Sequence, residues 1–315
     1  MNKRSIAVAA LLLGVGLLWA QSAGLPAGGE EARDRLNESP RHGEWITYSA
    51  EGGDRVEAWV VYPERNDPAP VVVVIHENRG LNDWARAVAD QFAAEGFIAI
   101  APDFLSGKAP GGAGTRAVDP DGARDLIRTL EQEEIYRRLR GAVQYATSLP
   151  AATKRYAVVG YCWGGANSFG YATQDPNLAA AVVFYGTSPA TESLRNVRAP
   201  VLGLYGGADN RVNATIPAAE AEMKRLGKRY EVEIYDGAGH AFLRGQDGQN
   251  GANMAATEKS WPRAINFLKQ ALENRVMLNV EQKRDTVLAV FTTADDGSFA
   301  CDYETVPEAA DIAAN

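Results

Sequence analysis

Uninterrupted apolar runs recur along the chain from about residue 69 to residue 205. "APVVVVIHE", "FIAIAPDF" and "RYAVVGYC" are rich in β-branched or small apolar residues and lack the alternation of a half-exposed strand. Such runs are typical of strands that are buried on both faces of a sheet. Three later segments, "AAAVVFYG", "APVLGLYGGAD" and "YEVEIYDGAGH", also predict strands.

Segments with helical spacing separate these strands. The pattern predicts a helix that begins at Gly164, and further helices over 84–95, 125–148, 213–227 and 254–273. Strands that alternate with helices indicate an α/β fold with a mainly parallel central sheet and helices on both faces. Ahead of them, two alternating runs around 51–54 predict a β-hairpin.

The two ends of the chain differ from this pattern. Residues 1–23 place two basic residues before a short apolar run and then small residues, which predicts a signal peptide and a periplasmic or secreted protein. No stable membrane insertion is expected after cleavage, although an uncleaved anchor is the alternative. Residues 24–42 are polar and predict a linker, and 43–274 form the main domain. Residues 275–315 are an acidic, Ala-rich extension that we expect to be partly disordered, although "TVLAVFTT" could form a strand.

The composition narrows the function without setting it. The chain has 315 residues, a formal net charge of −8 and 46% hydrophobic residues, which suits one large α/β domain. The acidic balance gives no general reason to bind nucleic acid, so a small-molecule partner is expected. No metal or cofactor is expected, because the sequence contains no H-E-x-x-H motif or paired-cysteine ligand set. Nothing in the pattern indicates an oligomeric state.

Four reactive side chains follow predicted strands. Glu77 comes after "VVVVIH", Cys162 after "AVVGY", Asp209 after "LYGGA" and His240 after "YDGAG". Sites in open α/β sheets form beyond the carboxyl ends of the strands. We therefore expect these four residues to meet in one site.

Cys162 lies in the sequence G-Y-C-W-G over residues 160–164. This spacing matches the G-x-S-x-G nucleophile elbow, with a thiol in place of the hydroxyl. A sharp strand-to-helix turn crowds the positions two before and two after the nucleophile, which explains the glycines. The turn would also place the thiol at a helix N-terminus, where the dipole favours a thiolate. The alternative is a small buried cysteine before a helix.

His240, in a tight glycine-flanked loop, is a candidate general base. Asp209 could orient its imidazole, or alternatively cap its own loop or the next helix. The order nucleophile, acid, histidine is that of the α/β-hydrolases. The other two histidines, His42 and His76, compete with His240, and we interpret His76, at a strand end, as structural. Cys301 could pair with Cys162 in an oxidising compartment, but it lies outside the core pattern.

These motifs together resemble the dienelactone hydrolases, or carboxymethylenebutenolidases, of the α/β-hydrolase superfamily. "VGYCWGG", "GGADNRV", "GAGHAFLR" and "VVVVIHENRG" carry the resemblance, which extends over about residues 43–273. The resemblance implies an α/β-hydrolase fold in which Cys162 is the nucleophile, His240 the base and Asp209 its orienting acid. It also implies that Glu77 helps to generate the thiolate when substrate arrives; the alternative from the residues alone is an ion pair of Glu77 with Arg79 or Arg244.

The resemblance implies further roles in substrate binding. The backbone N–H groups of Trp163 and Asn78 would form the oxyanion hole, and Arg244 would bind a substrate carboxylate. A second arginine is expected before the elbow, and the candidates are Arg116, Arg124 and Arg128.

The leading hypothesis is a hydrolase of an activated, carboxylate-bearing ester or lactone that works through an acyl-enzyme. One alternative is a broader carboxylesterase, thioesterase or peptidase on the same site. Another is a non-catalytic binding protein with the same fold. A redox role is disfavoured because no C-x-x-C pair is present.

Overall fold

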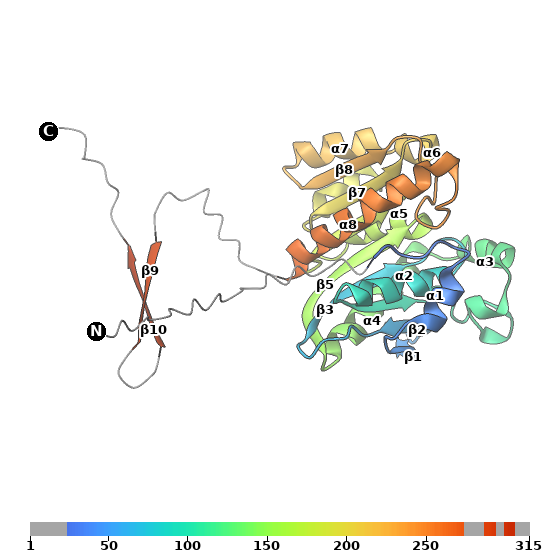
Figure 1. Cartoon of the computed structure of the whole chain (residues 1–315). Helices are drawn as coiled ribbons and strands as arrows, with labels where there is room; N and C mark the ends of the chain where they lie inside the picture. Colours follow the sequence, from blue (N-terminus) through green and yellow to red (C-terminus); the bar gives the residue numbers. More distant parts are fainter. Residues whose placement is uncertain (1–23, 274–286, 294–298, 306–315) are drawn as a thin grey trace, which may run out of the picture. The chain divides into compact units, whose positions relative to one another are not determined.

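The computed structural model describes residues 24–273, together with 287–293 and 299–305 (Figure 1). The chain divides into two compact units, Met1–Leu272 and Glu273–Asn315. Among the described residues, no helix is long and apolar enough to cross a membrane. The predicted signal peptide lies outside the described residues, so it stays a prediction.

The first unit contains an eight-stranded sheet in the order β1-β2-β4-β3-β5-β6-β7-β8. The first two strands form the expected antiparallel hairpin, and β2 is antiparallel to β4, while every other neighbouring pair is parallel. The prediction of a mainly parallel sheet is therefore confirmed. The strands are β1 (Gly43–Ser49), β2 (Arg55–Val61), β3 (Ala69–Ile75), β4 (Ile98–Pro102), β5 (Ala152–Tyr161), β6 (Ala180–Phe184), β7 (Val201–Gly206) and β8 (Tyr230–Tyr235).

Helices cover both faces of the sheet (Figure 1). On one face, α2 (Asp83–Ala94) and α8 (Ala252–Leu272) pack over the central strands. The other face is covered by α4 (Gln132–Ser148), α5 (Trp163–Ala172) and α7 (Ile216–Arg225). The shorter helices are α3 (Pro120–Ile127), α6 (Asn210–Asn213), η1 (Pro110–Gly112), η2 (Thr115–Ala117), η3 (Thr191–Asn196) and η4 (Gln249–Gly251).

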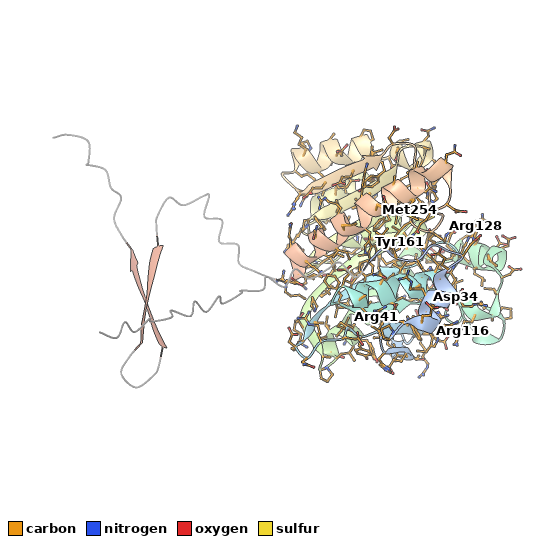
Figure 2. The ribbon with its side chains drawn as sticks, in the orientation of Figure 1. Asp34, Arg41, Arg116, Arg128, Tyr161 and Met254 are labelled. Atoms are coloured by element: carbon orange, nitrogen blue, oxygen red, sulfur yellow. The ribbon has the colours of Figure 1, made fainter. Side chains whose placement is uncertain are left out.

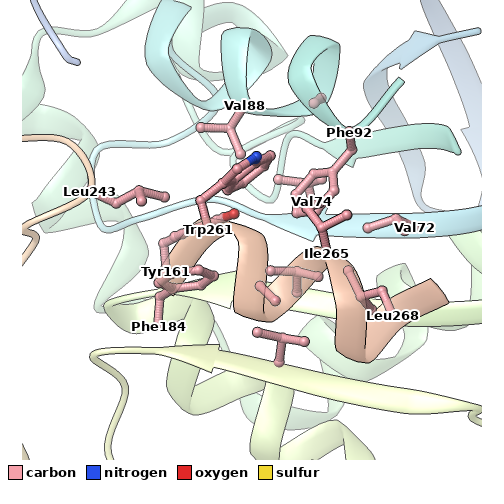
Figure 3. Packing of buried hydrophobic residues seen from close by; sticks show 14 of the residues in the cluster. Val72, Val74, Val88, Phe92, Tyr161, Phe184, Leu243, Trp261, Ile265 and Leu268 are labelled. Carbon is pink, nitrogen blue, oxygen red and sulfur yellow. The ribbon is translucent and has the colours of Figure 1, made fainter. Parts of the chain in front are cut away.

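The two-sided cover explains the uninterrupted apolar runs. Successive side chains of a strand point to opposite faces. Val72 and Val74 accordingly pack in the cluster that contains Phe92 and Trp261 (Figure 3), whereas Val73 packs in the cluster on the opposite face. A strand in this position needs apolar residues at every position, so the alternation of a half-exposed strand is lost.

The single helix expected over 125–148 is wrong, because the structure has two helices there. The first, α3, begins earlier, where the Asp119 side chain accepts a hydrogen bond from the Gly122 N–H at 2.7 Å and Pro120 occupies the first helical position. This is the usual chemistry of a helix N-terminus. The chain then leaves the helical conformation at Glu131, which is extended, before α4 starts.

Residues 24–42, expected to be a linker, are instead docked on the domain. The segment carries α1 (Ala32–Glu38), and both Ala27 and Ala32 are buried. Side chains of the domain bind its backbone. The carbonyls of Gly24, Pro26 and Ala27 accept hydrogen bonds from Gln91 Nε2, Gln246 Nε2 and Trp84 Nε1, at 3.2, 2.9 and 3.2 Å.

A buried ion pair fixes the end of this segment. Arg41 Nη2 lies 2.5 Å from Asp90 Oδ2, with side-chain exposures of 14% and 4%. The Ser39 hydroxyl donates to the other oxygen of Asp90 at 2.6 Å. The docked segment thus continues directly into β1.

In the second unit, β9 (Val287–Thr293) pairs antiparallel with β10 (Phe299–Thr305). The strand predicted at "TVLAVFTT" is therefore confirmed. The disorder expected elsewhere in 275–315 falls on residues outside the described ranges.

Candidate active site

The turn from β5 into α5 holds Cys162 in a strained backbone conformation, with φ at 56° and ψ at −114°. A non-glycine residue rarely adopts positive φ, and such strain is found mainly at functional sites. The flanking glycines are required sterically. A Cβ at Gly160 would collide with the Gly164 carbonyl, and a Cβ at Gly164 would collide with the carbonyls of Ile75 and His76.

Three of the four strand-end residues form a continuous hydrogen-bonded array. Cys162 Sγ lies 3.0 Å from His240 Nε2, and His240 Nδ1 is hydrogen-bonded to Asp209 Oδ2. Asp209 follows β7 and is only 8% exposed. Its other oxygen accepts from the Val212 N–H at 3.4 Å, so the carboxylate also caps α6. This is the geometry of a nucleophile, a base and a group that orients the base.

The surroundings of Cys162 favour the neutral thiol. Burial, reinforced by the nearby Glu77 carboxylate, raises the pKa of Cys162 to about 11. Hydrogen bonds to the sulfur from the backbone N–H groups of Trp163 and Asn78 act in the opposite direction, as does the charge of Arg211. Both Trp163 and Asn78 also line the cavity in front of the sulfur, where the oxygen of an attacked carbonyl would develop its charge.

Glu77 lies beside the array and is tied to Arg244. Its side chain is 3% exposed, and Oε2 accepts from Arg244 Nε at 2.6 Å. The second oxygen, Oε1, has no hydrogen-bond partner among the described residues. A buried carboxylate oxygen without a partner is costly, and it marks Glu77 as a group with spare proton-accepting capacity.

A cavity of about 370 Å³ opens in front of the sulfur. Its polar lining includes three arginines: Arg124, Arg128 and Arg211. Both Arg124 and Arg128 were candidates for the second substrate arginine, and both belong to the α3 region (Figure 2 labels Arg128).

The other two arginines that the sequence suggested for substrate binding do not line the Cys162 cavity. Arg244 and Arg116 line a different cavity of about 700 Å³, beside Trp45. Arg116 is 3.0 Å from Glu57 and packs over the Trp45 ring at 4.4 Å. The structure therefore does not bring Arg116 to the sulfur, and it places Arg244 against Glu77.

Several residues that line the Cys162 cavity were not singled out from the sequence, among them Arg211 and Tyr185. Arg211 stands two residues after Asp209 in "GGADNRV", a motif used only for its acid. Tyr185 follows β6 with φ at 41°, a buried hydroxyl, and its ring 5.3 Å from that of His240. The position of Tyr185 at a strand end was the available signal.

The two competing histidines lie outside the array. The His42 side chain is 70% exposed and lies 3.9 Å from Glu44. His76 is completely buried behind Glu77. No group of three or more His, Cys, Asp or Glu side chains suited to a metal occurs within the part of the chain that the structure describes.

The covered, mainly parallel sheet and the strand–turn–helix that presents Cys162 define the protein as an α/β hydrolase. Solved structures support this class. A crystal structure titled as a dienelactone hydrolase from Anabaena variabilis aligns with a TM-score of 0.56 at 21% identity, covering 74% of this chain and 99% of that one. A structure titled as a dienelactone hydrolase-like promiscuous phosphotriesterase from metagenomic libraries aligns with a TM-score of 0.64 at 25% identity, with the same coverage.

The chain belongs to the dienelactone hydrolase family, whose model matches residues 56–272. A relative from Escherichia coli O157:H7, named "Putative carboxymethylenebutenolidase", is 30% identical over 237 residues, covering 69% of this chain and 83% of the relative. One of the same name from Saccharolobus solfataricus is 28% identical over 258 residues, covering 71% and 97%. The protein is therefore a carboxylic ester hydrolase, as the sequence predicted.

Proposed function

We propose that the protein hydrolyses a small, activated ester or lactone that bears a carboxylate, with Cys162 as the nucleophile. The observation that carries this proposal is the array in which Cys162 Sγ lies 3.0 Å from His240 Nε2 and Asp209 holds the opposite ring nitrogen. A cavity of about 370 Å³ in front of the sulfur has the size of a small-molecule site.

The reaction proceeds through a thioester. The Cys162 proton passes to His240 Nε2 as the sulfur attacks the carbonyl carbon, and the backbone N–H groups of Trp163 and Asn78 stabilise the resulting oxyanion. Collapse of the intermediate breaks the ester C–O bond, and the leaving oxygen takes the proton from His240. Water then gives a proton to His240 and attacks the thioester, which releases the carboxylic acid product and restores the thiol.

Glu77 assists the first proton transfer in this proposal. Because the pKa of the Cys162 thiol is raised to about 11, Glu77 first accepts the thiol proton and then passes it to His240, so that the proton remains available for the leaving oxygen. Glu77 Oε1 is free to serve, while Oε2 is held by Arg244.

The cationic lining of the cavity favours an anionic substrate. Arg124, Arg128 and Arg211 surround the opening, and a guanidinium binds a carboxylate well because its N–H groups form a planar fork. Arg211 is the arginine whose charge acts on Cys162 itself. We assign it as the main contact for the substrate carboxylate.

An activity panel tests the proposal. Wild-type protein should hydrolyse p-nitrophenyl acetate and cis-dienelactone, and Cys162→Ala should lose at least about 10³-fold in kcat because the nucleophile is gone. Cys162→Ser replaces the thiol with a hydroxyl nucleophile at the same place and serves as the matched variant. Thioester and peptide substrates in the same panel separate the lactonase from a broader hydrolase. Wild type that is inactive on every substrate, or Cys162→Ala that is fully active, contradicts the proposal.

We also propose that the protein is exported, since residues 1–23 have the order of charged, apolar and small residues that signal peptides have. Fractionation of expressing cells, with N-terminal sequencing of the product, tests this. Full-length protein retained in the cytoplasm would contradict it.

A further inference from the structure

His76 directly follows β3 and is completely buried, yet the catalytic array leaves it without a role. Both ring nitrogens have partners. Nδ1 lies 2.7 Å from the Glu77 carbonyl oxygen, and Nε2 lies 3.3 Å from the Phe104 backbone nitrogen. Since a backbone N–H only donates, Nε2 is the acceptor and the ring proton is on Nδ1. The imidazole is therefore a neutral donor to Glu77.

The carbonyl that accepts this hydrogen bond shares a peptide group with the Asn78 N–H. A trans peptide is planar, and its C=O and N–H point in opposite directions. Holding the Glu77 oxygen on the His76 side therefore turns the Asn78 N–H to the other side. That N–H is one of the two that hydrogen-bond the Cys162 sulfur.

The His76 ring also contacts the residue that supplies the second N–H. It stacks on the Trp163 indole, with ring centroids 5.5 Å apart and planes inclined by 21°. The Phe104 ring packs edge-on against both rings, with its centroid 5.3 Å from that of His76 and 5.5 Å from that of Trp163. One imidazole thus contacts Trp163 and the carbonyl of the peptide group that supplies the Asn78 N–H.

We propose that His76 is a positioning residue for the oxyanion hole. Its Nδ1–H locks the Glu77–Asn78 peptide with the N–H facing Cys162, and its ring braces Trp163. The proposal rests on the hydrolytic function proposed above, and it gives a buried histidine at a strand end a task in transition-state stabilisation rather than in core packing alone.

A matched pair of variants separates positioning from packing. In His76→Asn, the side-chain nitrogen is bonded to Cγ, as Nδ1 is, so the donor to the Glu77 carbonyl can be kept. In His76→Gln, the amide reaches the place of Nε2 and can accept from Phe104, but the donor at the Nδ1 position is lost. Both variants lose the ring and its stacking on Trp163, so their losses of packing are comparable.

The variants are assayed with p-nitrophenyl acetate, below the melting temperature of each protein. We expect kcat of His76→Gln to fall about 100-fold with KM changed less than about threefold, since misplacing one oxyanion donor costs roughly that much. His76→Asn should stay within about tenfold of wild type although both variants melt at lower temperatures. Equal kcat values for the two variants, or losses that follow melting temperature alone, would overturn the proposal.

Two controls keep this result apart from the proposed function. If wild type itself is inactive, the hydrolytic function fails. The histidine assignment is then decided by nitrogen NMR of the labelled protein, in which His76 should show a protonated Nδ1 and an unprotonated Nε2 at neutral pH. The opposite tautomer would overturn the assignment whatever the activity.

Discussion

At the scale of single residues, the carboxylate of Glu77 disfavours ionisation of Cys162, the thiol that it would help to activate in the proposed mechanism. Its charge is the second cause, after burial of the thiol, that raises the pKa of Cys162 and so keeps the resting sulfur protonated. A protonated thiol is a poor nucleophile and is slow to oxidise, which protects the free enzyme. In the proposed mechanism, the thiolate therefore forms only when the thiol proton is transferred to Glu77 or His240.

Glu77→Gln should therefore make the resting thiol more acidic. The amide removes the negative charge that disfavours the thiolate. The pH at which iodoacetamide alkylation of Cys162 reaches half its maximal rate should therefore fall below that of wild type, for which the thiol pKa is raised to about 11. Burial, the larger cause, remains, so the fall is partial. Glu57→Gln, which removes a carboxylate paired with Arg116 in another cavity, is the control. An alkylation profile that is unchanged or moves to higher pH would refute this account of Glu77.

Arg211→Gln tests how the substrate carboxylate is bound. We expect KM for cis-dienelactone to rise roughly tenfold, the loss of one charge-assisted hydrogen bond, with little change for neutral p-nitrophenyl acetate. Arg116→Gln, an arginine outside the Cys162 cavity, should change neither. Equal effects of Arg211→Gln on both substrates would contradict the assignment of Arg211 as the contact for the substrate carboxylate.

The sequence predicted which residues could do chemistry better than it predicted their surroundings. Cys162, Asp209 and His240 each follow a predicted strand, and parallel strands end at the same edge of the sheet, so their meeting could be foreseen. Arg211 and Tyr185 were missed because their place in the cavity depends on how separate loops approach each other. No local pattern records that approach.

At the scale of elements, the first turn of α5 contacts the sheet through its backbone. Gly164 faces the carbonyls of Ile75 and His76, and a Cβ at Gly165 would meet the Phe184 carbonyl at 2.6 Å. A helix that packs this closely fixes the direction of the elbow and hence of the nucleophile.

Gly164→Ala should therefore unfold or displace the start of α5. Overpacking against backbone that cannot yield costs about 3 kcal/mol or more, so chemical denaturation should show a large loss of stability. Gly245→Ala is the matched control, because its new Cβ would lie 3.8 Å from the nearest atom. A melting temperature for Gly164→Ala equal to that of the control would show that the turn has room to relax.

The strands were easier to foresee than the helices. A strand buried on both faces is apolar at every position, which is a strong signal in β3 and in the second half of β5. The break between α3 and α4 was missed because helical spacing continues through 128–131, while the cue for an earlier start, Asp119 before Pro120, was not used. Capping chemistry decided these boundaries, and periodicity did not.

At the scale of the whole molecule, the domain is held partly by a segment that composition assigns to a linker. The buried pair of Arg41 with Asp90 makes the clearest test. Arg41→Ala would leave a carboxylate that is 4% exposed with the Ser39 hydroxyl but no charged partner, and we expect a loss of about 3 kcal/mol in denaturation.

Arg33→Ala provides the comparison. Arg33 pairs with Asp83 at 2.8 Å, but its side chain is 78% exposed, so little change in stability is expected. Equal losses of stability in the two variants would mean that burial does not determine how much the Arg41–Asp90 ion pair stabilises the protein.

The docking of residues 24–31 has a consequence for how this protein diverges in evolution. Its backbone carbonyls receive the side chains of Trp84, Gln91 and Gln246, and the Gly29 N–H donates to the Arg244 carbonyl at 2.8 Å. Every amino acid has a backbone carbonyl, so these hydrogen bonds do not themselves depend on side-chain identity, whereas the buried Pro26 and Ala27 restrict which side chains fit. The family model begins at residue 56, well inside the folded unit, so this protein trimmed to the matched region would lose the docked segment that contacts Arg244.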